Sequence, residues 1–551
     1  MSARAEAPFV WSLLVAVVTA AVLVFSVKTQ IFDTNFYSLW EAAALLAGDD
    51  PYRDFFEWGI PGQMAVSAAV QWLVGYRLIG EFVLQWAFIV AGMVISFRLA
   101  YRASGSVVAA LFASLVALIA VAVTPIYHYP KLFFYPALLA VAWRYLDRPS
   151  AGIGALLGVT TAVAFLFRHD HGIYLGIGSV LAFALAPMTA RSIPAPRAAL
   201  KDAAAYVAAA AVVLVPWMIV VHRAEGLPQY LQSRLLLAHG DEAPPPSVLY
   251  DVALAANPLR LVRSGAGDAE GFLWLEQIVL LVPLLLLGSA GIDIAAKRLR
   301  ARPLPPDTAA IVLAGAFLGV LSLRLLREPS YATLLAPTTA AFAARFLTRS
   351  WWPIRAVAVA AFLLSALAGI LVVRTTSIAQ TAETVEDLPR LFGRLLMHPP
   401  IDGFIARPDV EHDDRRAPLS AGEPVPLAVL MRYVRDCTRD GDRVLVTGST
   451  PFQVGYLVER PIAGGHLYWH KGWRSDPVHE AESLNMLRRQ SVPFALSTHD
   501  PVLEDLKPYP RILAHFMSRY VEVPETGGRL LIEKDRRATG EFGPLRYRCF
   551  R

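Results

Sequence analysis

The sequence predicts a polytopic α-helical membrane protein with about eleven transmembrane helices, followed by a C-terminal α/β extracytoplasmic domain. Of its 551 residues, 55% are hydrophobic and only 17% are charged. Apolar runs recur near the length of about 20 residues that crosses the hydrocarbon core of a bilayer. These runs stop near residue 375, after which charged residues become more frequent. Together these observations exclude an ordinary soluble protein.

The predicted spans follow one another through mostly short connections. They lie at about 9–27, 80–101, 106–124, 132–146, 151–168, 172–188, 203–221, 273–292, 308–325, 331–347 and 356–373. The first run is longer than the about 7–15 apolar residues of a signal-peptide core, so we expect a retained anchor. The loop 28–79 is too polar to span the membrane. Within it we expect an amphipathic helix at 36–46 that lies at the membrane surface and a second short helix at 61–75.

Charge placement predicts the orientation of the chain. If the N-terminus is cytoplasmic, every loop that falls inside is basic, as cytoplasmic loops are. The basic residues of these loops are Arg98, Arg102, Arg144, Arg148, Arg191, Arg197, Lys201, Lys297, Arg298, Arg300, Arg302, Arg345, Arg349 and Arg355. An odd number of spans then places the loop 28–79 and the C-terminal segment outside. We therefore attribute the net charge of +6 to topology and expect no nucleic-acid partner, because no basic face or binding motif is present.

The chain divides into a membrane domain, residues 1–375, and an extracytoplasmic domain, residues 376–551. Strands are predicted at 443–448, 492–496 and 529–532, with helical patterns between them. Two cysteines, Cys437 and Cys549, are too few for a zinc ribbon or an iron–sulfur framework. They could pair if this domain lies in an oxidising compartment.

The first acidic residue after the first span is Asp33. One role for its carboxylate is to cap the helix predicted at 36–46. Another is to act as a general base that takes a proton from an attacking hydroxyl. The two roles do not exclude each other. Asp54 and Glu57, later in the same loop, either support such a site or are solvated loop charges.

Cations also occur where the topology rule disfavours them, at three helix ends on the outer face. These residues are Lys131, Arg168, Arg324 and Arg327. One interpretation is a pocket for an anionic lipid headgroup, because arginine binds phosphate bidentately and lysine acts as a point charge. The other is snorkelling to lipid phosphates or pairing with Asp170 and Glu328. The convergence of three loops favours the pocket.

Two histidines, His169 and His171, flank Asp170. Residues two apart on a helix do not share a face, and no third strong ligand is evident, so no cofactor is expected and a divalent metal is the less favoured alternative. We expect these histidines to hydrogen-bond to substrate or phosphate. The full set of expected pocket residues is Tyr37, Tyr52, Arg53, Asp54, Glu57, His128, His169, Asp170, His171, Glu328 and Tyr331.

Two stretches carry a family resemblance. The first combines Asp33 and Tyr37 with the run Gly48-Asp49-Asp50-Pro51-Tyr52-Arg53-Asp54-Phe55 and with Pro61-Gly62. The second is Phe167-Arg168-His169-Asp170-His171-Gly172, which is similar to an Arg-x-Asp-x-Gly element. With the multi-span topology, they resemble the GT-C glycosyltransferases, and more narrowly the bacterial branch related to protein O-mannosyltransferases and the lipid A aminoarabinose transferase.

The resemblance implies an inner-membrane enzyme that uses a polyprenyl-phosphate-linked sugar on the extracytoplasmic face. Asp33 corresponds to the loop aspartate of the family, the expected base. The family often has an acidic pair here, but Thr34 follows Asp33, which makes a metal-dependent variant less expected. The implied reaction is an inverting displacement by a hydroxyl of a glycan, lipid or protein acceptor. The phosphate leaving group would be met by Lys131, Arg168 and Arg324 or Arg327.

Other functions are compatible with the same topology. A transporter or lipid flippase predicts charges near the bilayer midplane and broken helices. In this chain, prolines such as Pro136 and Pro216 occupy mid-span positions, and the charges lie at helix ends. A ligase or polymerase that uses diphosphate-linked glycans would need similar cations. A non-catalytic receptor would bind its partner through the outer domain.

Overall fold

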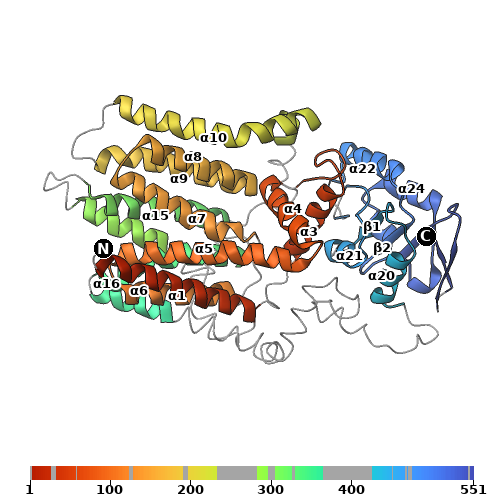
Figure 1. Cartoon of the computed structure of the whole chain (residues 1–551), viewed down its shortest axis with the longest axis horizontal. Helices are drawn as coiled ribbons and strands as arrows, with labels where there is room; N and C mark the ends of the chain where they lie inside the picture. Colours follow the sequence, from red (N-terminus) through yellow and green to blue (C-terminus); the bar gives the residue numbers. More distant parts are fainter. Residues whose placement is uncertain are drawn as a thin grey trace.

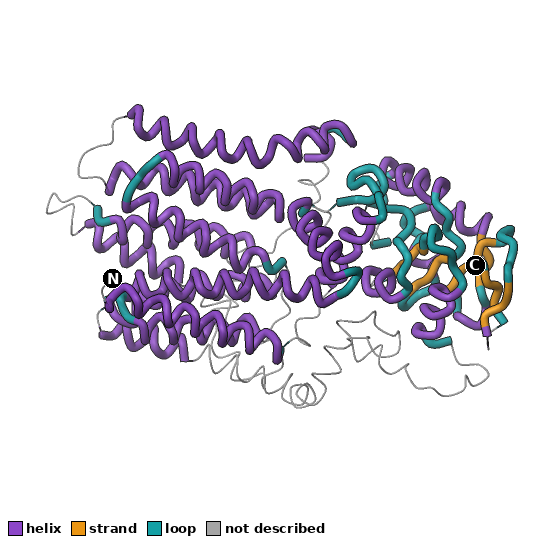
Figure 2. The backbone as a smooth tube through the Cα atoms, in the orientation of Figure 1, coloured by secondary structure: helices purple, strands orange, loops and turns teal. Residues whose placement is uncertain are grey.

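The computed structural model describes residues 3–26, 33–57, 59–122, 128–189, 196–231, 282–295, 304–325, 329–350, 352–363, 425–448, 451–465, 468–469, 474–543 and 546–551. A bundle of long helices forms one part of the molecule and an α/β domain the other, with two short helices of the first loop between them (Figure 1). The N-terminus lies at the end of the bundle farthest from the C-terminal domain. Strands occur only in the C-terminal domain among the described residues (Figure 2).

The long helices correspond to the predicted spans. They are α1 (Ala3–Phe25), α5 (Leu78–Ser104), α6 (Val107–Ala122), α7 (Pro130–Asp147), α8 (Ala151–Phe167), α9 (His169–Thr189), α10 (Pro196–Ala224), α15 (Pro306–Leu325) and α16 (Pro329–Thr348). Two further helices, Val282–Ala295 and Trp352–Leu363, fall on the remaining predicted spans. Each predicted span is therefore helical where its residues are described, apart from residues 26, 106 and 168 at the ends of three spans.

Length and apolarity single out three described helices as able to cross a membrane, namely Leu78–Ser104, His169–Thr189 and Arg197–Ala224. Other helices are apolar but shorter over their described residues: Phe9–Phe25, Val107–Ala122, Ala151–Phe167, Val282–Ala295, Pro306–Ser322 and Trp352–Leu363. The total of about eleven spans stays a prediction.

Small residues allow the helices to approach closely, as in membrane bundles generally. A Cβ atom added to Gly92 of α5 would lie 2.1 Å from the carbonyl oxygen of Leu132 on α7. A Cβ atom added to Gly158 of α8 would lie 2.2 Å from the carbonyl oxygen of Tyr206 on α10. A larger side chain at either glycine would therefore push two helices apart.

The direction of the helices determines which residues meet at each end of the bundle. The backbone N–H of Leu304, just before α15, donates to the carbonyl of Met188 near the end of α9 at 3.3 Å. The C-terminal end of α15, which includes Arg324, therefore lies at the end where α9 begins with His169. This is the end that adjoins the C-terminal domain (Figure 1).

The first loop contributes α3 (Asp33–Leu46) and α4 (Pro61–Val74). We predicted a helix at 36–46 lying at the membrane surface, but α3 is buried on several sides. Phe36, Leu39 and Trp40 are each at most 2% exposed. Helices α4 and α5 cover part of α3, and α21 (Pro451–Leu457) of the C-terminal domain covers another part. The helix is buried because α21, which lies far away in the sequence, packs against it.

The C-terminal domain has a four-stranded sheet in the order β1-β2-β4-β3. Its strands are β1 (Val444–Thr447), β2 (Phe494–Ser497), β3 (Tyr520–Glu522) and β4 (Leu530–Glu533). Strands β1 and β2 are parallel, and β4 is antiparallel to β2 and β3. The three predicted strands are confirmed. The three-residue strands β3, β5 (Gly540–Phe542) and β6 (Tyr547–Cys549) were not predicted, because so short a run has no clear alternation.

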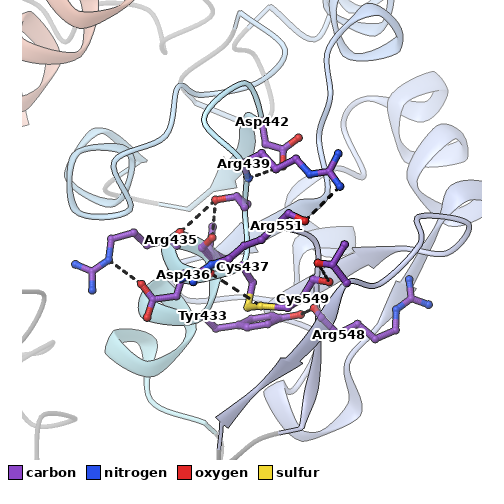
Figure 3. Close-up of a disulfide and its surroundings, with 12 residues drawn as sticks. Tyr433, Arg435, Asp436, Cys437, Arg439, Asp442, Arg548, Cys549 and Arg551 are labelled. Carbon is purple, nitrogen blue, oxygen red and sulfur yellow. Dashed lines mark hydrogen bonds and ion pairs between the residues drawn. A yellow bond between two sulfur atoms is a disulfide. The ribbon is translucent and has the colours of Figure 1, made fainter.

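Helices cover this sheet and link its strands. They are α20 (Leu427–Asp436), α21, α22 (Pro477–Arg489), α23 (Val502–Asp505) and α24 (Pro510–Arg519). Cys437, which follows α20, forms a disulfide with Cys549 in β6 (Figure 3). The backbone N–H of Phe550 also donates to the carbonyl of Cys437 at 3.0 Å. Structural disulfides persist in oxidising compartments, so this bond fits an extracytoplasmic location.

One hydrophobic core is shared by the first loop and the C-terminal domain. It includes Phe36, Trp40, Phe55, Met64, Phe82, Leu430, Val434, Phe452, Tyr456 and Phe494. An ion pair between Arg443 and Asp49, with atoms 2.5 Å apart, lies beside it. The described part of loop 28–79 and the C-terminal domain therefore form a continuous packed unit. The predicted domain boundary at 375 lies outside the described residues.

Candidate functional site

Helix α3 begins at Asp33 and lies between the bundle and the C-terminal domain (Figure 1). The ring of Phe36 packs on Tyr456 of α21 with centroids 5.6 Å apart. The ring of Tyr37 meets Phe452 edge-on at 5.0 Å, and its hydroxyl donates to Glu41 one turn later. Tyr37 therefore supports the contact between α3 and α21. The side chain of Asp33 lies outside the described part of the chain.

A charged cluster forms where α7 and α9 begin. Lys131 is 2% exposed, and Tyr135 lies one turn further along the same face of α7. The hydroxyl of Tyr135 hydrogen-bonds to Nδ1 of His171. The Oδ1 atom of Asp170 accepts from Nε of Arg168 at 2.9 Å and lies 3.5 Å from Nε2 of His171. The structure thus brings together four of the residues predicted to form the pocket.

The local sequence explains why the chain reverses direction sharply between α8 and α9. Arg168 has extended backbone dihedrals, φ −171° and ψ 124°, and separates α8 from α9. A Cβ atom added to Gly172 would lie 2.2 Å from Cβ of Phe165. Only glycine lets the first turn of α9 pack this closely against the end of α8. The spacing of the Arg168 to Gly172 motif is therefore explained by backbone packing as well as by charge.

The electrostatics of this cluster favour an anion. Burial, reinforced by the charges of Arg168 and Lys131, holds the pKa of His128 well below its usual range, so this residue is neutral near pH 7. Helices α7 and α9 both start here, and the N-terminus of a helix carries a partial positive charge. A phosphate group at this position would meet Lys131, Arg168 and two helix N-termini.

A second hydrogen-bond network is formed by Glu57, Tyr230 and His169. The hydroxyl of Tyr230 donates to Oε2 of Glu57 at 2.6 Å and lies 2.6 Å from Nε2 of His169. The carboxylate of Glu57, which is 0% exposed, also accepts from the backbone N–H of Ile60. The backbone N–H of His169 donates to the carbonyl of Gly59 at 3.2 Å. These bonds fasten the first loop to the start of α9.

Aromatic rings enclose this second network. Tyr52 meets the ring of Tyr230 edge-on at 5.4 Å, and its hydroxyl accepts from Nε1 of Trp217 at 3.2 Å. Tyr52 has a left-handed backbone, φ 82°, which is unusual for a residue with a side chain. Tyr230 was not predicted, because it follows α10 in a short polar stretch that matches no motif.

Some predicted residues do not join either network. Arg53 pairs with Asp54 at 2.7 Å and with Asp50 at 3.7 Å, and its side chain is 61% exposed. His169 and His171, by contrast, do join the networks, but different ones: His169 contacts Tyr230 and His171 contacts Tyr135. The side chains of Arg324, Arg327, Glu328 and Tyr331 lie outside the described residues. Their roles stay predictions.

No group of three histidine, cysteine, aspartate or glutamate side chains is placed to hold a metal ion within the described ranges. The polar groups near Arg168 instead bond to one another through Asp170, His171 and Tyr135. Chemically, the arrangement offers cations for a phosphate and buried carboxyl and imidazole groups for hydroxyls.

The fold of this chain is similar to that of proteins of known structure. No protein-family model matches the sequence, and no curated protein matches it significantly. The crystal structure of ArnT from Cupriavidus metallidurans bound to undecaprenyl phosphate aligns over 95% of this chain and 97% of its own, with a TM-score of 0.55 and 14% sequence identity. The chain therefore has the fold of ArnT. The apo structure of the same ArnT aligns over 96% and 98%, with a TM-score of 0.51 and 17% identity.

The likeness to ArnT, the lipid A aminoarabinose transferase, covers both the bundle and the C-terminal domain. It confirms the predicted fold class, a helical bundle followed by an α/β domain, and it confirms the predicted resemblance to the aminoarabinose transferase at the level of the fold. At this identity it assigns no role to an individual residue.

Proposed function

We propose that this protein is a membrane glycosyltransferase. It moves a sugar from a polyprenyl-phosphate donor to an acceptor hydroxyl on the extracytoplasmic face of a bacterial inner membrane, with inversion at the anomeric carbon. The observation that carries the proposal is the cation cluster of Lys131 and Arg168, which lies where two helix N-termini meet, at the end of the bundle that adjoins α3. A protein of the same fold binds undecaprenyl phosphate.

Asp33 is the proposed general base. Its carboxylate takes the proton of the acceptor hydroxyl, whose oxygen attacks the anomeric carbon. The bond between that carbon and the phosphate oxygen breaks, and polyprenyl phosphate leaves with the electron pair. Lys131 and Arg168, with Arg324 or Arg327, stabilise the negative charge that develops on the phosphate. One well-placed donor of this kind is worth about 3–4 kcal/mol of barrier lowering.

The C-terminal domain has a structural part in this proposal. Because Phe452 and Tyr456 of α21 pack on α3, the domain holds the helix that carries Asp33. It also bounds the outer side of the site, where an acceptor would approach. No cofactor takes part, and the remaining partners are the lipid-linked donor, the acceptor and the surrounding membrane lipids.

The test uses purified full-length protein in lipid nanodiscs with a panel of sugars linked to polyprenyl monophosphate or diphosphate. We expect consumption of a monophosphate-linked sugar, release of polyprenyl phosphate, and inverted stereochemistry in the product by NMR. Consumption of diphosphate-linked glycans alone would contradict the proposal in favour of a ligase or polymerase. Movement of the lipid between leaflets without cleavage of the sugar–phosphate bond would contradict it in favour of a flippase.

A further inference from the structure

A buried chain of polar side chains joins the start of α5 to the middle of α3. Glu81, in the first turn of α5, is 0% exposed, and its Oε1 lies within hydrogen-bond distance of the Ser67 hydroxyl on α4. The same hydroxyl lies 3.1 Å from the backbone oxygen of Ser38 on α3. Nε2 of Gln63, also on α4, donates to Oγ of Ser38 at 2.8 Å. Three helices are thus tied together at Ser67.

Counting hydrogens determines the protonation state of Glu81. The side-chain oxygen of Gln71 accepts from the backbone N–H of Arg77 at 2.9 Å, so the amide nitrogen of Gln71 faces Glu81 and donates to Oε1 at 2.8 Å. The hydroxyl of Ser67 has a single proton. It therefore cannot donate to Glu81 and to Ser38 at once. Both contacts are satisfied when Glu81 carries the proton and donates to Ser67, which donates to Ser38.

Burial leads to the same assignment. Among the described residues, no lysine or arginine forms an ion pair with Glu81, and its Oε2 atom has no hydrogen-bond partner. An ionised carboxylate in such a place, without a cation and with one oxygen unsatisfied, would be strongly destabilised. A neutral carboxyl leaves only an unpaired carbonyl oxygen, which costs far less.

We propose that Glu81 is a neutral carboxyl group that donates a hydrogen bond to Ser67 and thereby positions α3, the helix that begins with Asp33. Ser38 lies five positions after Asp33 on that helix, so a shift of Ser38 carries Asp33 with it. Glu81 is a positioning residue and touches no reacting atom. The kinetic part of this inference rests on the proposed transferase activity, whereas its structural part does not.

The structural part is tested on the full chain by infrared spectroscopy and hydrogen exchange. We expect the C=O stretching band of a protonated carboxyl at neutral pH, and its loss in E81Q. In E81A, the backbone amides of residues 36–46 should exchange faster than in the wild type. The matched control is D202A, which removes another buried carboxylate, one that accepts from the hydroxyl of Tyr145 at 2.9 Å between α10 and α7. It should leave exchange in residues 36–46 unchanged.

The kinetic part compares the same variants per folded molecule. A displacement of about 1 Å at a reacting group can cost about a hundredfold in rate. We expect E81A to lower kcat about a hundredfold with KM for the lipid donor little changed. E81Q stays uncharged and should retain kcat within about tenfold, since it loses one hydrogen bond at most. If E81A does not fold, S67A breaks the same chain by removing one hydroxyl and should lower kcat about tenfold.

Each result bears on a separate part of the inference. Absence of the infrared band, or its persistence in E81Q, overturns the neutral assignment. Equal exchange or equal kcat losses in E81A and D202A overturn the positioning role, because the effect is then general destabilisation. If the wild type transfers no sugar, the proposed function has failed, and the infrared and exchange results still decide the inference on their own.

Discussion

The hydroxyl of Tyr230 lies 2.6 Å from a carboxylate oxygen of Glu57, across 173 positions of sequence. It also lies 2.6 Å from Nε2 of His169. The variant Y230F keeps the ring contacts with Tyr52 and Trp217 but leaves Glu57 and His169 without this partner. We expect a loss of about 1–3 kcal/mol in the free energy of unfolding and a drop of about tenfold in kcat.

The measurement is thermal unfolding together with steady-state transfer. Y145F is the matched control, because the hydroxyl of Tyr145 also bonds to a buried carboxylate, Asp202, but far from the site. That variant should lose stability and keep its kcat. Identical kinetic losses in the two variants would remove the assigned role of Tyr230.

Lys131 and Arg168 are expected to bind the donor phosphate. K131A should weaken binding of undecaprenyl phosphate about a hundredfold, because a largely buried cation is lost from the anion site. K131R should restore only part of the lost affinity, since a guanidinium binds phosphate with a different geometry from an ammonium group. Binding is measured by native mass spectrometry or microscale thermophoresis in nanodiscs. R102A, at the opposite end of the bundle, is the control, and equal weakening by K131A and R102A would contradict the site.

Arg443 and Asp49 are expected to couple the C-terminal domain to the first loop. Their side chains are only 17% and 13% exposed, and their charged atoms lie 2.5 Å apart. A double-mutant cycle with alanine at both positions should give a coupling energy of about 1–3 kcal/mol in unfolding. The same cycle on the exposed pair Arg53 and Asp54 should give no measurable coupling. Indistinguishable cycles would show that the Arg443 contact is not a specific link.

The pKa of His128 predicts how stability varies with pH. Burial, followed by the charges of Arg168 and Lys131, keeps its folded pKa well below the unfolded value of 6.5. Its stabilising contribution is therefore complete above about pH 6.5 and is lost as the pH falls from 6.5 toward the folded pKa. The slope is at most about 1.4 kcal/mol per pH unit for one proton.

Thermal unfolding at pH 7.5, 6.5 and 5.5 checks this expectation. H128Q should show a smaller decrease between pH 6.5 and 5.5 than the wild type. A wild-type slope in H128Q would mean that another group is responsible.

Much of the bundle could be predicted from the sequence because membrane spans depend on local composition. Long apolar runs predict helices, and basic loops predict which ends lie together. Successive spans alternate in direction, which predicted that Lys131 and Arg168 lie at the same end of the bundle. The burial of α3 could not be predicted, because it depends on Phe452 and Tyr456, more than 400 positions away.

Hydrogen-bond partners were harder to predict than helices. Tyr230 and Glu81 stand in no recognisable motif, and their importance arises only from what the fold places beside them. The disulfide between Cys437 and Cys549 was left open, because pairing depends on both the compartment and the distance between two chain segments.

The most direct test of the account concerns Asp33, which is proposed to remove the proton from the acceptor. D33N has nearly the same shape but cannot act as a base. Single-turnover transfer with donor already bound should fall by about 10²–10⁴, while the affinity for polyprenyl phosphate stays at its wild-type value. A folded D33N protein that transfers sugar at the wild-type rate would contradict the proposed mechanism.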